Sequence, residues 1–210
     1  AMSAEQIRNI IAAGERTTRD VFFQAAGGLL DAVHVVHRHG IGERMTPGFE
    51  TMWELPGNYP RVLSAGHWNV SSNSEGEAVG STGARRIMIN GCNQHGDPIV
   101  EIVEMAGLVT VATVEQFMWM DFAQVIEAGQ KYGGAEGNIT ITHGGTVEPG
   151  DVPVVGVILP EINRTCNAIA IVPNHYSGYV LDHSVTSEFN KQLAYGWRVS
   201  SWPAHGVGGL

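Results

Sequence analysis

Short apolar runs alternate with turn-forming residues from Asn69 to Thr142, at the spacing of neighbouring antiparallel strands. Two of these runs, residues 98–105 and 108–114, are separated by the dipeptide Ala106 and Gly107. A short link that ends in glycine predicts a hairpin, because the tight turn needs a positive φ that glycine adopts without a steric cost. The stretch therefore predicts an antiparallel meander.

The same rhythm continues towards the end of the chain. No helical pattern long enough for a crossover helix lies between the runs, which argues against a parallel α/β sheet. We therefore predict an all-β fold, an antiparallel β-sandwich of jelly-roll type, in a domain that covers residues 67–210. Its further candidate strands are 117–126, 138–142, 152–159, 166–172, 179–186 and 195–201.

Residues 1–66 have a different pattern. A capping box of Ser3 and Gln6 begins an isoleucine stripe, so residues 4–13 predict a short amphipathic helix. Residues 40–66 are rich in Pro and Gly, with aromatic side chains between them, which is typical of an extended connector. We predict that residues 1–66 form an N-terminal arm and a connector that packs on the sheet.

Charge balance and cysteine content argue against several classes of protein. The 210 residues include 12 Lys and Arg against 21 Asp and Glu, a net charge of −9, which disfavours a surface that follows nucleic-acid phosphates. Cys92 and Cys166 are too few for a disulfide framework or a zinc–thiolate site, so we expect both to be reduced. No apolar window has the length of a spanning helix and no signal-peptide pattern begins the chain, so we expect neither membrane insertion nor secretion.

A histidine pair is the sharpest candidate for chemistry. His37 and His39 are followed by Glu43, and on a strand both imidazoles would lie on one face beside the carboxylate. The spacing resembles the first half of the metal motif of cupins, which are jelly-roll proteins. Asp31 and Glu50 stand where that motif has glycines, and its second half has no counterpart. We therefore predict no catalytic residue, no cofactor and no metal, with His37, His39 and Glu43 as candidate ligands in an alternative, cupin-like metalloenzyme.

Two further patterns have both a chemical and a structural interpretation. Glu101, Glu104 and Asp121 would act as glycosidase carboxylates only if the fold placed them within about 5 to 10 Å of each other. Solvated strand positions explain them more simply. Indole rings can stack on sugars, which keeps a carbohydrate-binding alternative open, but we favour tryptophans in the core and at a subunit interface. The tryptophans are Trp53, Trp68, Trp119, Trp197 and Trp202.

The run from Gly80 to Gly91, GSTGARRIMING, resembles a signature of structural proteins of tailed bacteriophages, notably phages of cyanobacteria and other marine bacteria. In those proteins a TGAR turn, here at residues 82–85, leads into a strand. The resemblance continues through residues 101–113, through the Gly-rich loop and strand at 133–141, and through AIAIVP at 168–173. These motifs are structural, and no catalytic residue follows from them.

The resemblance implies a non-enzymatic virion protein, made in the host cytoplasm, that serves as a head decoration or cement protein or as a neck or tail component. We expect a homo-oligomer, with a trimer favoured, that binds a major capsid or tail protein through a sheet edge or the N-terminal arm. We expect neither nucleic acid nor membrane as a partner. A carbohydrate-binding host-recognition module and the cupin-like enzyme are the alternatives.

Overall fold

The computed structural model describes residues 40, 53–55, 57–129, 133–160 and 162–172. The chain divides into two compact units, Ala1–Arg38 and His39–Leu210, and all described residues belong to the second. The predicted helix at 4–13 and the candidate strands at 179–186 and 195–201 lie outside the described residues.

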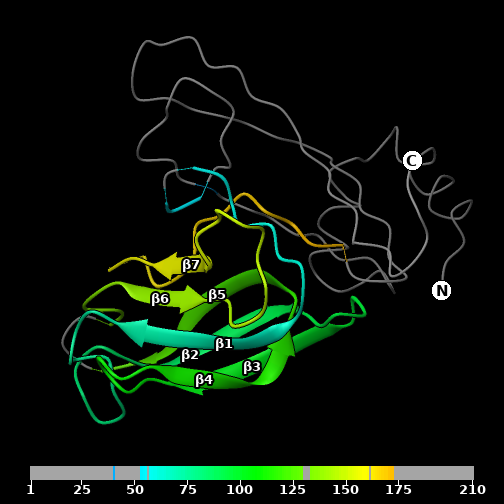
Figure 1. Cartoon of the computed structure of the whole chain (residues 1–210). Coiled ribbons are helices and arrows are strands. Elements are labelled where there is room, and N and C mark those ends of the chain that lie inside the picture. The colour runs from blue at the N-terminus through cyan, green and yellow to red at the C-terminus, as the bar shows by residue number, and fades with distance from the viewer. Residues whose placement is uncertain (1–39, 41–52, 56, 130–132, 161, 173–210) are drawn as a thin grey trace, which may run out of the picture. The chain divides into compact units, whose positions relative to one another are not determined.

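Every regular element in this part of the chain is a β-strand (Figure 1). The strands form two antiparallel sheets, with the orders β4-β1-β6-β7 and β3-β2-β5. The prediction of an all-β, antiparallel fold is confirmed for these residues. The strands are β1 (Gly66–Ser72), β2 (Ala84–Cys92), β3 (Pro98–Glu104), β4 (Val111–Phe117), β5 (Trp119–Ala128), β6 (Ile139–Thr142) and β7 (Val154–Ile158).

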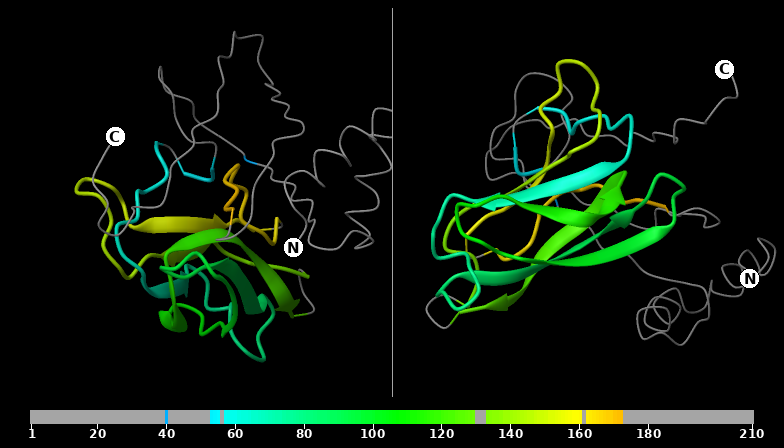
Figure 2. Two further views of the ribbon diagram at one scale, coloured as in Figure 1. Left: turned by 90° about the vertical axis from the view of Figure 1, so that its right-hand side faces the viewer. Right: turned by 60° about the horizontal axis from the view of Figure 1, so that its bottom comes forward.

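Figure 2 shows the strands from two further directions. Both sheets contribute to one hydrophobic core. Along β1 the burial alternates, with Trp68 and Val70 fully buried and the residues between them facing outwards. Trp68 stacks on Phe117 of β4 with ring centroids 4.7 Å apart, and Ile87 and Ile89 of β2 enter the same core from the other sheet. Because each large apolar side chain contributes about 1.5–3 kcal/mol when buried, this shared core is what holds the two sheets together.

The link at Ala106 and Gly107 differs from the prediction. Gly107 has the expected positive φ, 64°. However, β3 pairs with β2 whereas β4 pairs with β1, so the two runs lie in different sheets. The predicted hairpin and meander are therefore wrong, because the turn carries the chain from one sheet to the other. The crossing lets Val103 of β3 and Phe117 of β4 reach the same core from opposite sides.

On one side, residues 163–165 link the edge strands of the two sheets. Thr165 bridges Ile158 of β7, and its N–H donates to the carbonyl of Ala123 of β5 at 2.9 Å. The N–H of Val125 donates to the carbonyl of Asn163 at 2.8 Å, which adds a second link to β5. The predicted strand at 166–172 is wrong, since the bridges of this segment lie at 164 and 165 and residues 166–172 pair with no described strand.

On the opposite side, the side chain of Glu101 links the two sheets. The Glu101 carboxylate of β3 accepts hydrogen bonds from the N–H groups of Val114 and Glu115 of β4, at 2.8 and 2.9 Å. These two donors would otherwise lie unused on the edge of the β4 sheet. Occupied edge donors discourage a foreign strand from pairing there.

Part of the connector before β1 packs against the same core. Trp53 is buried, and its ring meets that of Tyr59 edge-on with centroids 5.2 Å apart. The Trp53 indole N–H donates to the carbonyl of Gly57 at 3.0 Å, and Tyr59 packs against the core cluster. In this stretch aromatic anchors hold a chain that has no regular structure.

Candidate functional site

Three loops gather at one end of the two sheets, which we call the loop end. They are the β1–β2 loop at 73–83, the β3–β4 link at 105–110 and the described residues 129 and 133–138 of the β5–β6 loop. Antiparallel pairing brings them together, because β1, β3 and β5 all end where β2, β4 and β6 begin. The loop end lies at the left of Figure 1, where the arrow of β1 ends.

A buried carboxylate joins these loops. Glu77 is fully buried, and one of its carboxylate oxygens accepts from the N–H groups of Glu136 and Gly137 at 2.7 and 2.8 Å. The other oxygen accepts from the N–H of Ala84 at 2.6 Å, and the Glu77 carbonyl accepts from the N–H of Gly107 at 2.5 Å. Hydrogen bonds to a charged acceptor are among the strongest in proteins. Glu77 therefore fixes all three loops relative to one another.

Glu136 and Asn73 add further links between the loops. The Glu136 carboxylate accepts from the hydroxyl groups of Thr82 and Ser74. The Asn73 side-chain oxygen accepts from the N–H of Asn138 at 2.8 Å, across the gap between the first and third loops. The polar groups of the loop end are thus largely satisfied by one another, which gives the loops a fixed shape.

Three large apolar side chains are among those that this framework presents to solvent. Val79 in the first loop is 61% exposed, and Leu108 and Val109 in the β3–β4 link are 54% and 66% exposed. A β-bridge between Ala78 and Ala106 holds the two loops side by side. Large apolar side chains on a rigid, solvent-facing surface are typical of protein contact sites. We call Val79, Leu108 and Val109 the apolar tip.

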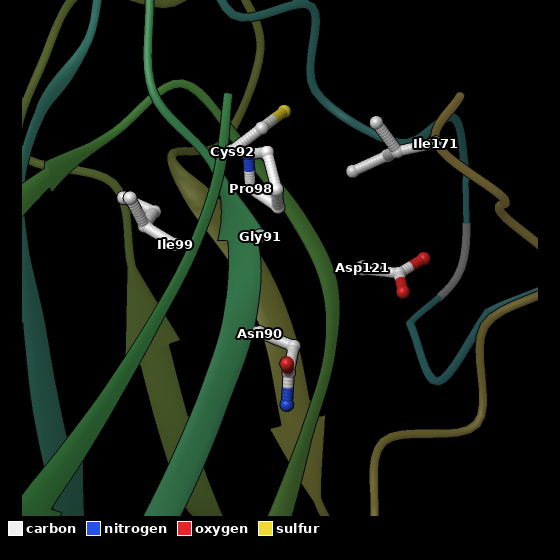
Figure 3. A pocket seen from close by; sticks show the side chains of 7 residues that line it. All are labelled: Asn90, Gly91, Cys92, Pro98, Ile99, Asp121 and Ile171. Atoms are coloured by element: carbon white, nitrogen blue, oxygen red, sulfur yellow. The ribbon is translucent and has the colours of Figure 1, made fainter. Parts of the chain in front are cut away.

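A small hollow of about 90 Å³ lies elsewhere, at the start of β3 (Figure 3). Asn90, Cys92 and Pro98 lie on one side of it, and Asp121 and Ile171 lie opposite. Burial raises the pKa of the Cys92 thiol to about 12, and the Asp121 carboxylate adds to this effect. A thiol needs a lowered pKa to act as a nucleophile, so Cys92 is a structural cysteine.

Glu54 is a second group with a perturbed titration. One of its oxygens accepts from the N–H of Cys166, and the other has no hydrogen-bond partner in the described part of the chain. Burial raises the pKa of Glu54, and burial together with Glu54 raises the pKa of Tyr59. Perturbed acids mark functional sites mainly where a cleft exposes them to a substrate. Neither the hollow of Figure 3 nor the one between His67 and Gln94 is lined by Glu54 or Tyr59, so we assign the pair to packing of the connector.

The residues proposed from sequence as catalytic carboxylates have separate roles. Glu101 binds the β4 amides, and Glu104 forms an ion pair with Arg86 at 2.7 Å. Asp121 lines the hollow of Figure 3. They do not meet around one site, which agrees with their interpretation as strand residues. Trp53 and Trp68 are core residues, as favoured, and Trp119 is half-buried, whereas Trp197 and Trp202 lie outside the described residues.

His37, His39 and Glu43 also lie outside the described residues. Across the ranges that the structure describes, no group of three or more His, Cys, Asp and Glu side chains is placed to hold a metal ion. Cys92 and Cys166 are free and buried, as expected for reduced cysteines. Among the described residues, no helix is long and apolar enough to span a membrane.

Comparison with known proteins adds no relative. No protein-family model, no curated protein and no solved structure matches this chain. We therefore infer the function from the geometry of the described residues and from the sequence resemblance.

Sequence reasoning missed the residue on which the loop end depends. Glu77 lies in a polar run between Ser74 and Gly83, where an acidic residue is ordinarily solvent-exposed. The glycines around Glu77 are the available signal. A Cβ added at Gly83 would lie 2.8 Å from a Glu77 carboxylate oxygen, and a Cβ added at Gly76 would lie inside the Glu136 carboxylate. A glycine-flanked acid is compatible with many loops, so the pattern alone does not identify this role.

Proposed function

We propose that the protein is a non-enzymatic structural component of a phage particle, which assembles with itself and with a capsid or tail subunit. The observation that carries the proposal is the loop end, where a buried carboxylate fixes three loops and the surface they present is the apolar tip. A rigid apolar surface loses little conformational entropy on binding, which suits permanent assembly. The sequence resemblance to virion proteins supplies the setting.

The pairing of the strands supports a jelly-roll-type sandwich, the fold proposed for this subunit. β1 pairs with β6 in one sheet and β2 pairs with β5 in the other. In the sequence, β2 and β5 flank the β3–β4 crossing, and β1 and β6 flank β2 and β5 in turn. One long hairpin folded over itself would give this order. Jelly rolls are built by that kind of nested antiparallel pairing, and they recur in capsid proteins.

The loop end suits assembly better than the described sheet edges do. Glu101 occupies edge donors of β4, and residues 163–165 lie between β7 and β5. A partner strand would have to displace these contacts before it could pair. We therefore assign docking to the apolar tip, in a closed cyclic homo-oligomer for which a trimer is favoured.

Self-association tests this assignment directly. The double variant Leu108→Ser, Val109→Ser should weaken association at least about tenfold, because exposed apolar residues at an interface centre each contribute about 1 kcal/mol or more. The matched control is Val152→Ser, since Val152 is 62% exposed but lies in the β6–β7 loop at the other end. Sedimentation velocity over a concentration series measures both. If the double variant and Val152→Ser weaken association equally, or if neither weakens it, the apolar tip is not the docking surface.

The location of the protein tests the wider function. Immunogold labelling of purified phage particles should place the protein on the head, the neck or the tail. Its absence from purified particles would show that the virion assignment is wrong, whatever the oligomeric state of the isolated chain.

A further inference from the structure

The end of the sheets opposite the loop end carries a polar hollow of about 300 Å³, which we call the hollow end. It lies between the β1–β4 pair and the turn that joins β2 to β3. Its polar lining is His67 of β1, Glu115 and Gln116 of β4, and Asn93, Gln94 and His95 of the turn. The volume is at the lower limit of small-molecule sites, about 300 Å³, and fits a single small ring better than a long ligand.

The backbone around the hollow is shaped by a β-bulge. The register between β1 and β4 shifts between His67 and Asn69. The N–H of Trp68 inside the bulge donates to the Thr113 hydroxyl at 2.7 Å, and that hydroxyl donates to the carbonyl of Glu115 at 2.9 Å. Bulges recur beside binding sites because they change the direction in which side chains point. Here the bulge sets His67 beside Gln116.

Two side chains of the hollow, those of His67 and Asn93, are held in place. His67 bonds through Nδ1 to the carbonyl of Thr113 at 3.0 Å, and its Nε2 lies 3.3 Å from the Gln116 amide nitrogen. In the turn, the Asn93 side-chain oxygen accepts from the N–H groups of His95 and Asp97, at 2.8 and 3.0 Å. A site whose groups are already positioned binds without the entropic cost of ordering them.

The chemistry of the lining selects the class of ligand. No Lys or Arg is among the residues that line the hollow, and the Glu115 carboxylate has no partner in the described part of the chain, so an anion would be repelled. A purely donating cation would use only the oxygen acceptors of the lining and would leave the amide N–H groups of Gln94 and Gln116 unused. Hydroxyl groups both donate and accept, and they match carboxamides, imidazoles and a carboxylate together.

We propose that the hollow end binds a neutral sugar. Val114, which is 81% exposed and also lines the hollow, provides an apolar surface for the C–H face of a sugar ring. This site differs from the tryptophan platform considered from sequence, since its lining contains no aromatic residue other than the two histidines. It lies at the opposite end from the apolar tip, so the protein can bind a sugar while the loop end holds a partner.

Titration of the isotope-labelled full chain, followed by two-dimensional amide NMR, tests the proposal. The probes are glucose, galactose, mannose and N-acetylglucosamine, each up to about 50 mM, because single-ring ligands commonly bind with millimolar affinity. At least one sugar should shift the amide signals of Gln94, His95 and Gln116 in a saturable way. Gln116→Ala should weaken that binding at least about tenfold, whereas the control Thr110→Ala at the loop end should leave it unchanged.

Three results would overturn the assignment. The first is that none of the four sugars shifts these signals. The second is that a sugar binds with the same affinity to Gln116→Ala and to the unchanged chain. The third is that N-acetylarginine amide, titrated in parallel, saturates the site when the sugars do not, which would identify a cationic ligand instead. None of these three outcomes depends on the apolar tip, so this test and the association test fail independently.

Discussion

The two ends of the described domain use their polar groups in opposite ways. At the loop end the carboxylates of Glu77 and Glu136 accept hydrogen bonds from the loops themselves, and the exposed side chains include the apolar tip. At the hollow end Glu115 has no partner in the described residues, and the amides of Gln94 and Gln116 each use one contact on a neighbouring imidazole. One end therefore has its hydrogen bonds satisfied internally, whereas the other retains donors and acceptors for a ligand.

This difference teaches where stability and recognition lie in the same fold. Internally satisfied polar groups rigidify a surface and leave apolar contacts as its means of recognition. Polar groups that remain available contribute little to folding but can select a ligand by matching its donors and acceptors. The variants below should therefore affect stability at the loop end and leave it nearly unchanged in the hollow.

The largest effect is expected from Glu77→Ala. It removes the acceptor from the N–H groups of Ala84, Glu136 and Gly137, and should lower the free energy of unfolding by about 3–5 kcal/mol. Urea denaturation followed by tryptophan fluorescence measures the change. The matched control is Glu75→Ala, because Glu75 is an exposed acid in the same loop and its removal should cost less than about 0.5 kcal/mol. A similar loss in both variants would show that Glu77 does not organise the loop end.

A smaller effect, dependent on pH, is expected from His143 just after β6. Its ring lies 5.7 Å from Trp68, Nδ1 accepts from the N–H of Gly145 at 2.8 Å, and burial lowers its pKa from 6.5. The unfolded chain then takes up a proton before the folded chain does, so stability should fall as the pH drops below 6.5 and stay constant above it. The slope cannot exceed about 1.4 kcal/mol per pH unit, the limit for one proton.

His143→Asn is the variant that isolates this contribution, since a carboxamide can still accept from the Gly145 N–H and does not titrate. Urea denaturation between about pH 7.5 and pH 5 should show a shallower pH dependence for the variant than for the unchanged chain. His95→Asn is the control, because His95 is exposed in the turn between β2 and β3. Identical slopes for the unchanged chain and His143→Asn would contradict the prediction.

The smallest effect on stability is expected from Gln116→Ala in the hollow. Gln116 is exposed and its one described side-chain contact, to His67, is 3.3 Å long. Its removal should change the free energy of unfolding by less than about 0.5 kcal/mol, as measured by the same urea titration. A loss above about 1 kcal/mol would mean that the hollow is a structural element, and the contrast between the two ends would disappear.

Local pattern predicted several strands correctly. The alternation at residues 138–142 corresponds to β6, and the apolar run at 152–159 contains β7. In each case the signal is a property of adjacent residues, because β6 alternates with one buried face whereas β7 is a continuous apolar run that is buried at four consecutive residues. Trp68 belongs to the core for the same reason, since it takes an inward position in β1.

Partner choice was not predictable in this way. The runs on either side of Ala106 and Gly107 looked like a hairpin, yet β3 and β4 joined different sheets. Residues 166–172 had the composition of a strand but follow a bridging segment that already occupies the space between β5 and β7. Composition indicates that a segment can be extended, and the competition among all strands for neighbours decides whether it joins a sheet.

The sequence by itself determined that this region is an all-β, antiparallel domain with reduced cysteines, because those properties follow from local alternation and from composition. Only the tertiary structure decided which strands are neighbours, where the loop end and the hollow lie, and which acid is buried. Glu77 contacts Glu136 across 59 residues, and His67 contacts Gln116 across 49. A contact over such a separation leaves no periodic trace in the sequence, since any residue with the right donor or acceptor fits once the fold brings the two together.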